Sequence, residues 1–208
     1  AEAIVSATSL PVSGDFENGF GDAPDVLEET IKLSAEIELA GISIEDISPI
    51  DAQPYSFDLS VERIRAASAA ARALPKDFVL VARADGFMYG LYDLDEAIRR
   101  IQAFEAVGAD CVYVPYLNNL EAVAQVCRSV SVPVNVGISS VENASMTELA
   151  NAGAARISLG MALATATHTT LHNLSVSIFE QGDFSGLGDS MSYEAIDDCM
   201  TRGKVSAG

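Results

Sequence analysis

The fold of this chain is decided by residues 11–21, which read PVSGDFENGFG. A short apolar strand, expected over 10–14, leads into Asp15 and Glu17 and then into a glycine-rich turn. Side chains two residues apart on a strand point to the same face, so these two carboxylates point the same way. Oxygen ligands of this kind suit a hard cation such as Mg2+. Glycines such as Gly19 let the backbone turn sharply and come close to a ligand.

A second acidic pair, Glu45 and Asp46, ends the next apolar strand, expected over 42–45. The recurrence of paired carboxylates at successive strand ends is typical of an enzyme site. The alternative is that Asp15 and Glu17 only cap the helix that begins near residue 23.

Composition limits the classes of protein to which the chain can belong. The chain has 208 residues, 49% of them hydrophobic, which suffices for one sizeable core. The net charge of −18 argues against nucleic acid or an anionic membrane as partner. No run approaches the ~20 apolar residues of a membrane helix, and no basic leader precedes an apolar stretch. Three scattered cysteines suit a reducing compartment, so a cytoplasmic protein is expected.

Strand-like and helix-like segments alternate along the whole chain, with no linker between domains. Strands are expected at 10–14, 42–45, 78–83, 111–115, 132–136 and 155–159, and helices at 23–39, 59–74, 94–107, 120–130, 146–152, 162–180 and 192–202. This alternation is the signature of a (β/α) barrel or a doubly wound sheet. No GxGxxG follows a strand, which disfavours a dinucleotide-binding sheet. We therefore expect a single (β/α) barrel domain over residues 1–208.

Several strand-end motifs together resemble the isocitrate lyase and phosphoenolpyruvate mutase superfamily. They are PVSGDFENGFG at 11–21, SIED at 43–46, VARAD at 81–85, DLDEAIRRIQAFEAVGADCVYVP at 93–115 and VPVNV at 132–136. The resemblance implies an α/β fold of the (β/α)8 TIM type, of which this chain shows only strands three to eight and the C-terminal helices. Residues 1–10 read like the tail of a helix, and we expect the N-terminal quarter of the barrel to be missing.

The same resemblance implies an activity and a set of site residues. Members form or break C–C or P–C bonds next to a carboxylate through the enolate of a small 2-oxo acid. Asp15 corresponds to the direct ligand of Mg2+, for which Mn2+ can substitute, and Glu17 and Glu45 hold the metal's water molecules. Arg83 corresponds to the group that grips a substrate carboxylate or phosphonate, and Asn135 and Gly19 line the substrate pocket. Asp15, Glu45 and Arg83 are the expected catalytic residues.

Physical chemistry supports these roles, with structural alternatives for two of them. Mg2+ takes one or two carboxylates directly and keeps several waters. The charge of a metal ion stabilises a developing enolate oxygen without proton transfer. An arginine fork binds a carboxylate through two parallel hydrogen bonds. Structurally, Arg83 would instead form an ion pair with Asp85 or Glu45, and Asn135 would only form hydrogen bonds at a strand end.

The loop at 47–57 departs from the family pattern. It reads ISPIDAQPYSF and lacks Cys, Lys and His, whereas lyases of this superfamily carry a KKCGH-type motif there. Isocitrate lyase activity itself is therefore not expected, and the Lys and Asn of the mutase and hydrolase branch are missing too. The alternative to an enzyme is an incomplete or non-catalytic relative that retains the scaffold.

The resemblance also implies partners. A small carboxylic or phosphonic acid is the expected substrate, with no nucleic acid or membrane partner. Members are usually homodimers or homotetramers that exchange a C-terminal helix, here expected over 190–203. A glycine-rich turn at 182–188 precedes that helix and would let it reach a neighbouring subunit.

Overall fold

The computed structural model describes residues 1–138, 141 and 143–202. Two compact units divide the chain, Ala1–Ser158 and Leu159–Gly208. The first contains every predicted site residue, and the second contains the C-terminal helices. The expectation of one barrel domain over 1–208 stays a prediction.

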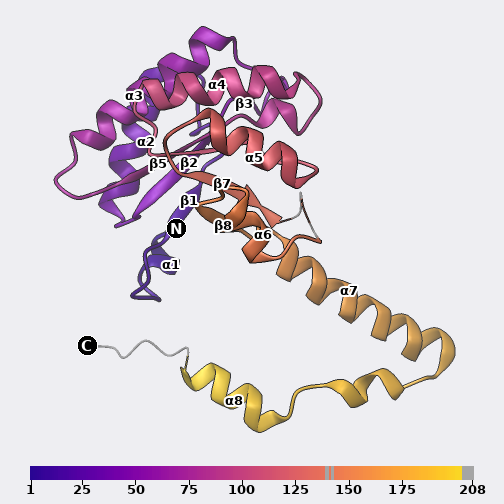
Figure 1. Cartoon of the computed structure of the whole chain (residues 1–208). Coiled ribbons are helices and arrows are strands. Elements are labelled where there is room, and N and C mark those ends of the chain that lie inside the picture. Colours follow the sequence, from indigo (N-terminus) through magenta and orange to yellow (C-terminus); the bar gives the residue numbers. More distant parts are fainter. Residues whose placement is uncertain (139–140, 142, 203–208) are drawn as a thin grey trace. The chain divides into compact units, whose positions relative to one another are not determined.

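A six-stranded parallel sheet forms the centre of the first unit (Figure 1). Its strands are β1 (Ser13–Asp15), β2 (Gly41–Glu45), β5 (Val79–Arg83), β6 (Cys111–Tyr113), β7 (Val134–Gly137) and β8 (Arg156–Ser158). They pair side by side in chain order, as successive right-handed βα units do. Arg156 Nη2 lies 3.4 Å from Ser13 Oγ, so the two edge strands β8 and β1 approach each other at their amino ends. The sheet is thus a curled half-barrel, and the described residues contain six of the eight strands expected for the complete fold.

Helices between the strands lie along one face of this sheet (Figure 1). They are α2 (Pro24–Glu36), α3 (Phe57–Arg72), α4 (Leu94–Ala106), α5 (Leu120–Ser129) and α6 (Met146–Asn151), and α1 (Glu2–Val5) precedes β1. The helix α3 begins earlier than the sequence predicts because Ser56 caps it, accepting a hydrogen bond from Leu59 N at 3.3 Å. The predicted order of strands and helices is otherwise confirmed, with boundaries that differ by a few residues.

Apolar side chains from the helices and strands pack into one core. Its fully buried members include Leu27, Ile31, Ile42, Ile44, Leu80, Ile101, Phe104 and Val112. Gly41 illustrates the close packing, because a Cβ there would lie 2.2 Å from the Val79 carbonyl oxygen.

The loop after β2 carries a small antiparallel pair that the sequence did not predict. It joins β3 (Ile47–Ser48) to β4 (Gln53–Pro54). Strands of two residues are too short to produce a periodic pattern. A single 3-10 turn, η1 (Asp85–Phe87), follows β5.

The second unit contains α7 (Ala162–Val176), a π-type turn at Ser177–Gln181, a 3-10 turn at Ser185–Asp189 and α8 (Tyr193–Arg202). No residue of α7 or α8 is buried within the described chain, and Phe179 and Tyr193 are almost fully exposed. The helix predicted over 190–203 is described as far as Arg202, and residue 203 lies outside the described residues. Its exchange between subunits stays a prediction. Within the described chain, the helices are too short or too polar to cross a membrane.

Candidate active site

The glycine-rich loop after β1 brings two predicted carboxylates to the carboxyl edge of the sheet. Asp15 ends β1, and Glu17 takes a left-handed conformation with φ of 50°. The Glu17 carbonyl oxygen accepts a hydrogen bond from Glu45 N at 2.7 Å, which fastens the loop to the end of β2. Gly19 has φ of 78°, and a Cβ there would lie 2.2 Å from Leu27 Cδ2. Tight packing against the core therefore requires this glycine, and its predicted contact with a substrate stays a prediction.

Arg63 of α3 fixes the conformation of the same loop through hydrogen bonds to its backbone. Its Nη1 donates to the carbonyl oxygens of Gly21 and Asp22, each at 2.5 Å, and its Nη2 donates to that of Asn18. The guanidinium carbon lies 4.2 Å from the centre of the Tyr55 ring. Burial lowers the pKa of Arg63 from its ordinary value. The charge of this buried side chain is thus used to orient backbone carbonyls of the loop.

Strand register places four side chains in one row across the sheet. Glu45 pairs with Arg83, Arg83 with Tyr113, and Tyr113 with Asn135. The guanidinium carbon of Arg83 lies 5.2 Å from the centre of the Tyr113 ring. Paired residues of parallel strands point to the same face, so the row faces the hollow side of the curled sheet.

Arg83 lies among three carboxylates. Its Nη1 donates to both oxygens of Asp15 at 2.9 Å, and its Nη2 lies 3.0 Å from Glu45 Oε1. Asp85 accepts from Nε at 3.0 Å and from Nη2 at 2.6 Å. One positive charge therefore faces three negative charges at the ends of three neighbouring strands.

Burial and the excess of negative charge raise the pKa values of two acids in this group, Glu45 and Asp85. Burial, followed by the charges of Asp85, Asp15 and Glu17, raises the pKa of Glu45 to about 7, although Arg83 opposes the shift. Burial also raises the pKa of Asp85 to about 6. Burial alone would lower the pKa of Arg83, but its hydrogen bonds to Asp85 and the nearby carboxylates raise it. Both acids are difficult to ionise here, so an added cation would stabilise the site.

The donor chemistry of this edge fits a hard divalent cation. Asp15, Glu17 and Glu45 offer only oxygen ligands, and the excess negative charge favours a doubly charged ion. Within the described part of the chain, no three His, Cys, Asp or Glu side chains are arranged so that together they could hold a metal ion. Arg83 occupies both oxygens of Asp15, so a metal would compete with the guanidinium for that carboxylate.

A second cluster, here called the Arg100 group, lies beside the first on the helix side. It contains Arg100, Asp46, Glu96, Tyr92 and Ser60. Arg100 Nη1 donates to Asp46 Oδ2 at 3.0 Å and to Ser60 Oγ at 3.0 Å, and its Nε donates to Glu96 at 2.9 Å. Asp46 also accepts from the Tyr92 hydroxyl and from Asp85 N, both at 2.8 Å. Asp46 thereby fixes the backbone of Asp85, which contacts Arg83.

Asn135 is buried at the end of the row. Its Nδ2 donates to Ser158 Oγ at 3.0 Å, whereas its Oδ1 has no hydrogen-bond partner within the described chain. A buried oxygen without a partner costs free energy, so a donor from a ligand or water would stabilise it. The predicted role of Asn135 in substrate binding stays a prediction.

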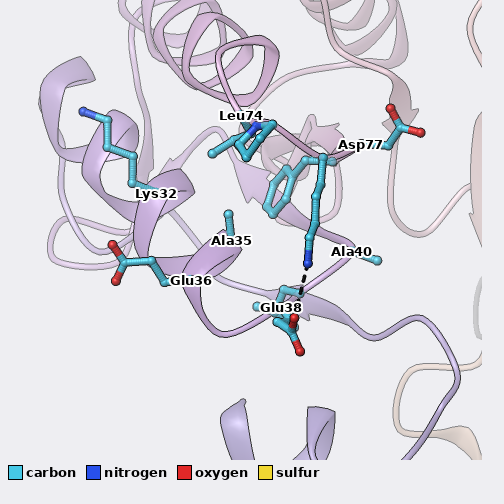
Figure 2. A pocket seen from close by; sticks show the side chains of 11 residues that line it. Lys32, Ala35, Glu36, Glu38, Ala40, Leu74 and Asp77 are labelled. Carbon is cyan, nitrogen blue, oxygen red and sulfur yellow. Dashed lines mark hydrogen bonds and ion pairs between the residues drawn. The ribbon is translucent and has the colours of Figure 1, made fainter.

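Described residues of this unit line two cavities that lie toward opposite ends of the sheet. The first, of about 380 Å³, lies beside Glu17 and Glu45. The second, of about 540 Å³, lies near the amino ends of β2 and β5 between Leu39, Leu74 and Phe78 (Figure 2). Lys76 and Glu38, which both line this cavity, form an ion pair at 3.2 Å. The smaller cavity is the relevant one, because barrel enzymes place their chemistry at the carboxyl ends of the strands.

The structure thus brings Asp15, Glu45 and Arg83 into direct contact, and the charge of Glu17 acts on Glu45. Arg63 and Arg100 were assigned no role from the sequence. Both occupy positions within the buried stripe of a helix, and that spacing is the signal that would have identified them.

A parallel half-barrel with carboxylates and an arginine at its strand ends is the arrangement of a (β/α)-barrel enzyme. The model of the phosphoenolpyruvate phosphomutase family matches residues 1–179. The chain belongs to this family, within the superfamily that the sequence motifs resemble.

Individual relatives support the assignment. A candidate lyase/mutase from Burkholderia cenocepacia J2315 has 40% sequence identity and a TM-score of 0.88, and the match covers 95% of this chain and 72% of that one. The 2-methylisocitrate lyase of Escherichia coli K12 is 32% identical over 142 residues, 65% of this chain and 47% of the relative. A phosphonopyruvate hydrolase in complex with oxalate and Mg2+ has a TM-score of 0.77 at 22% identity, covering 97% and 72% of the two chains. The chain spans about half the length of the curated relatives that it matches.

Proposed function

We propose that this protein is a Mg2+-dependent enzyme that forms or breaks a C–C bond, or a P–C bond, next to the carboxylate of a small 2-oxo or 2-hydroxy acid. The observation that carries the proposal is the group of Asp15, Glu45 and Asp85 around Arg83. When bound, Mg2+ supplies the positive charge that stabilises an enolate oxygen. Mn2+ prefers similar oxygen ligands and would substitute for it.

Each side chain of the group has a role that its position supports. Asp15 would hold the metal directly, because its carboxylate is the most exposed of the three, at 66% for the side chain. Glu17 and Glu45 would hold its water molecules. Arg83 would bind the substrate carboxylate with its planar fork. In the metal-free chain, burial and the neighbouring carboxylates raise the pKa of Glu45 to about 7, and the charge of a bound Mg2+ would lower it, so Glu45 would hold the metal's waters as a carboxylate.

Chemistry on a carboxylic acid is favoured over P–C chemistry. The loop at 47–57 lacks Lys and His, which would hold a doubly charged phosphono group. The relative from Escherichia coli is a 2-methylisocitrate lyase, which agrees with this preference, whereas the matching family model is that of a phosphomutase. The absence of Cys from the same loop leaves the acid–base residue of such lyases without a counterpart, and this favours the second candidate, an incomplete or non-catalytic family member.

We further propose a homodimer or homotetramer. The exposed apolar side chains of the second unit, including Phe179, Tyr193 and Met200, support this assembly because they would be covered by a neighbouring subunit. Sedimentation at micromolar concentration should show a species larger than one chain, and a monomer would contradict the proposal.

Titration calorimetry tests the proposed activity. Oxalate, a planar mimic of the pyruvate enolate, should bind in the presence of Mg2+ and not in the presence of EDTA. A screen of 2-oxo and 2-hydroxy acids for turnover would follow. Absence of oxalate binding under both conditions would favour the non-catalytic candidate.

A further inference from the structure

The smaller cavity has a lining of mixed character. Glu17 and Glu45 supply carboxylates, and Asn18, Ser48 and Tyr89 are polar, whereas Ile47, Pro49, Ala52 and Leu91 are apolar. These four apolar residues are here called the apolar wall. The cavity of about 380 Å³ has room for a substituent of several carbon atoms beside the proposed metal site.

Charge decides what the cavity accepts. Among the described residues that line it, none is Lys, Arg or His. Two guanidiniums contact residues of the lining: Arg83 already contacts three carboxylates, and Arg63 donates to the backbone carbonyl oxygen of Asn18. The four carboxylates of Asp15, Glu17, Glu45 and Asp85 already outnumber the three positive charges of Arg83 and the proposed Mg2+. The carboxylate of the substrate adds one more negative charge, so a second anionic group would meet Glu17 and Glu45 without a further cation to compensate it, and like charges at close range repel strongly. An uncharged apolar group would instead bury its surface against the wall.

Hydrogen bonds hold the apolar wall in place. Ile47 pairs with Pro54 across β3 and β4, and Ile47 is only 8% exposed. The chain on either side of β4 is fastened by Ala52 N donating to Ser48 O and by Tyr55 N donating to Asp46 O, each at 2.9 Å. Leu91 is held by its own N donating to Gly86 O at 2.9 Å. The wall is thus preformed, so a ligand need not order it on binding.

We propose that this cavity is a subsite for an apolar substituent, and that the substrate is a monocarboxylic 2-oxo or 2-hydroxy acid with an uncharged aliphatic chain. This inference rests on the proposed function, because the proposed metal and Arg83 must hold the acid end of the same molecule. It distinguishes this chain from an enzyme for phosphonopyruvate, oxaloacetate or other acids with a second anionic group.

A ligand series tests the inference by competition with oxalate at saturating Mg2+. The series is pyruvate, 2-oxobutanoate and 2-oxopentanoate, with oxaloacetate and phosphonopyruvate as charged comparisons. Affinity should increase about fourfold with each added methylene. The two charged acids should bind more weakly than pyruvate. Equal affinities along the series, or tighter binding of a charged acid, would overturn the inference.

Two variants of Leu91 locate the effect on the wall. Leu91→Ala should remove most of the gain from pyruvate to 2-oxopentanoate, and Leu91→Arg should reverse the preference in favour of oxaloacetate. Ile50→Ala is the control, because Ile50 follows the wall residue Pro49 between β3 and β4, is 83% exposed and does not line the cavity. An equal loss in the control variant would contradict the assignment.

Oxalate distinguishes a failure of the proposed function from a failure of the apolar subsite, because it has no aliphatic chain to reach the wall. If oxalate fails to bind with Mg2+, the proposed function fails, and the subsite fails with it. If oxalate binds and the chain length has no effect, the proposed function stands and the apolar subsite is wrong.

Discussion

Two arginine clusters lie side by side at the ends of β2 and β5, and they are balanced in opposite ways. In the first, here called the Arg83 group, one guanidinium faces Asp15, Glu45 and Asp85. In the Arg100 group, one guanidinium faces Asp46 and Glu96, and further donors complete the shell around Asp46. The Arg100 and Asp46 side chains are only 6% and 1% exposed, whereas the Asp15 side chain is 66% exposed.

Strand geometry explains how neighbouring acids join different clusters. Glu45 and Asp46 are consecutive, so their side chains point to opposite faces of the sheet. Glu45 points to the hollow side and contacts Arg83, and Asp46 points to the helix side and contacts Arg100 of α4. The Arg100 group, buried and with its charges paired, stabilises the fold, whereas the Arg83 group, open to solvent and with excess negative charge, is suited to bind a ligand.

The largest expected effect comes from breaking the closed cluster. Arg100→Met should lower the free energy of unfolding by about 3–5 kcal/mol, because it leaves Asp46 buried without its cation. Urea denaturation of the metal-free protein measures this loss. Arg99→Met is the matched control on the same helix, since Arg99 also pairs with Glu96 but has a side chain 55% exposed. Its effect should be below about 1 kcal/mol, and equal effects in both variants would refute the distinction.

A substitution in the Arg83 group should change ligand binding and leave stability nearly unchanged. Asp15→Asn should weaken Mg2+-dependent oxalate binding at least about 10- to 100-fold, as the loss of a group that supports a metal does. Its free energy of unfolding without metal should change little, because Asp15 is exposed. Calorimetry and urea denaturation give the two readouts. Asp77→Asn removes the same charge at the other end of β5 and should leave oxalate binding intact; a comparable loss there would count against the site.

The pH dependence of stability should sharpen the comparison. The pKa of Glu45 is about 7 in the folded chain and 4.5 ordinarily, so the protonated side chain favours the folded state at pH values below 4.5. This stabilisation is lost as the pH rises toward 7. Between these values the metal-free protein should lose about 1–2 kcal/mol through this group, after allowance for solvent screening. Urea denaturation in EDTA at pH 5 and pH 7.5 measures the loss. Glu45→Gln should reduce the difference in free energy of unfolding between the two pH values. An unchanged difference would show that ionisation of Glu45 does not destabilise the folded state.

The smallest expected effect removes one donor of the closed cluster. Tyr92→Phe deletes the hydroxyl that donates to Asp46 at 2.8 Å and should lower the free energy of unfolding by about 1 kcal/mol. Tyr89→Phe, at an exposed tyrosine, should change it by less than about 0.5 kcal/mol. Thermal unfolding of both variants resolves the difference, and no effect of Tyr92→Phe would mean that Arg100 and Asp85 N satisfy Asp46 without the hydroxyl.

Much of the fold and part of the site could be predicted from the sequence. Apolar runs that alternate with helical segments predicted all six strands, and the strand-end positions of Asp15, Glu45 and Arg83 predicted that these residues lie at one edge of the sheet. The ion pairs of Arg83 with Glu45 and Asp85 were foreseen only as a structural alternative. The small pair β3–β4 was missed because two-residue strands have no period. The partners of Arg63 and, except for Glu96, those of Arg100 were missed because they lie about 40 to 54 residues away along the chain, a separation at which only the folded structure specifies a contact.

Arg63 also has a consequence for the order of events in folding. Its guanidinium reaches carbonyl oxygens of residues 18, 21 and 22, more than forty positions earlier in the chain. The glycine-rich loop that carries Glu17 therefore cannot reach its final conformation before α3 has packed against the sheet. Contacts between distant segments form slowly. Competence to bind a ligand should accordingly appear late in refolding, after most of the helical signal has recovered.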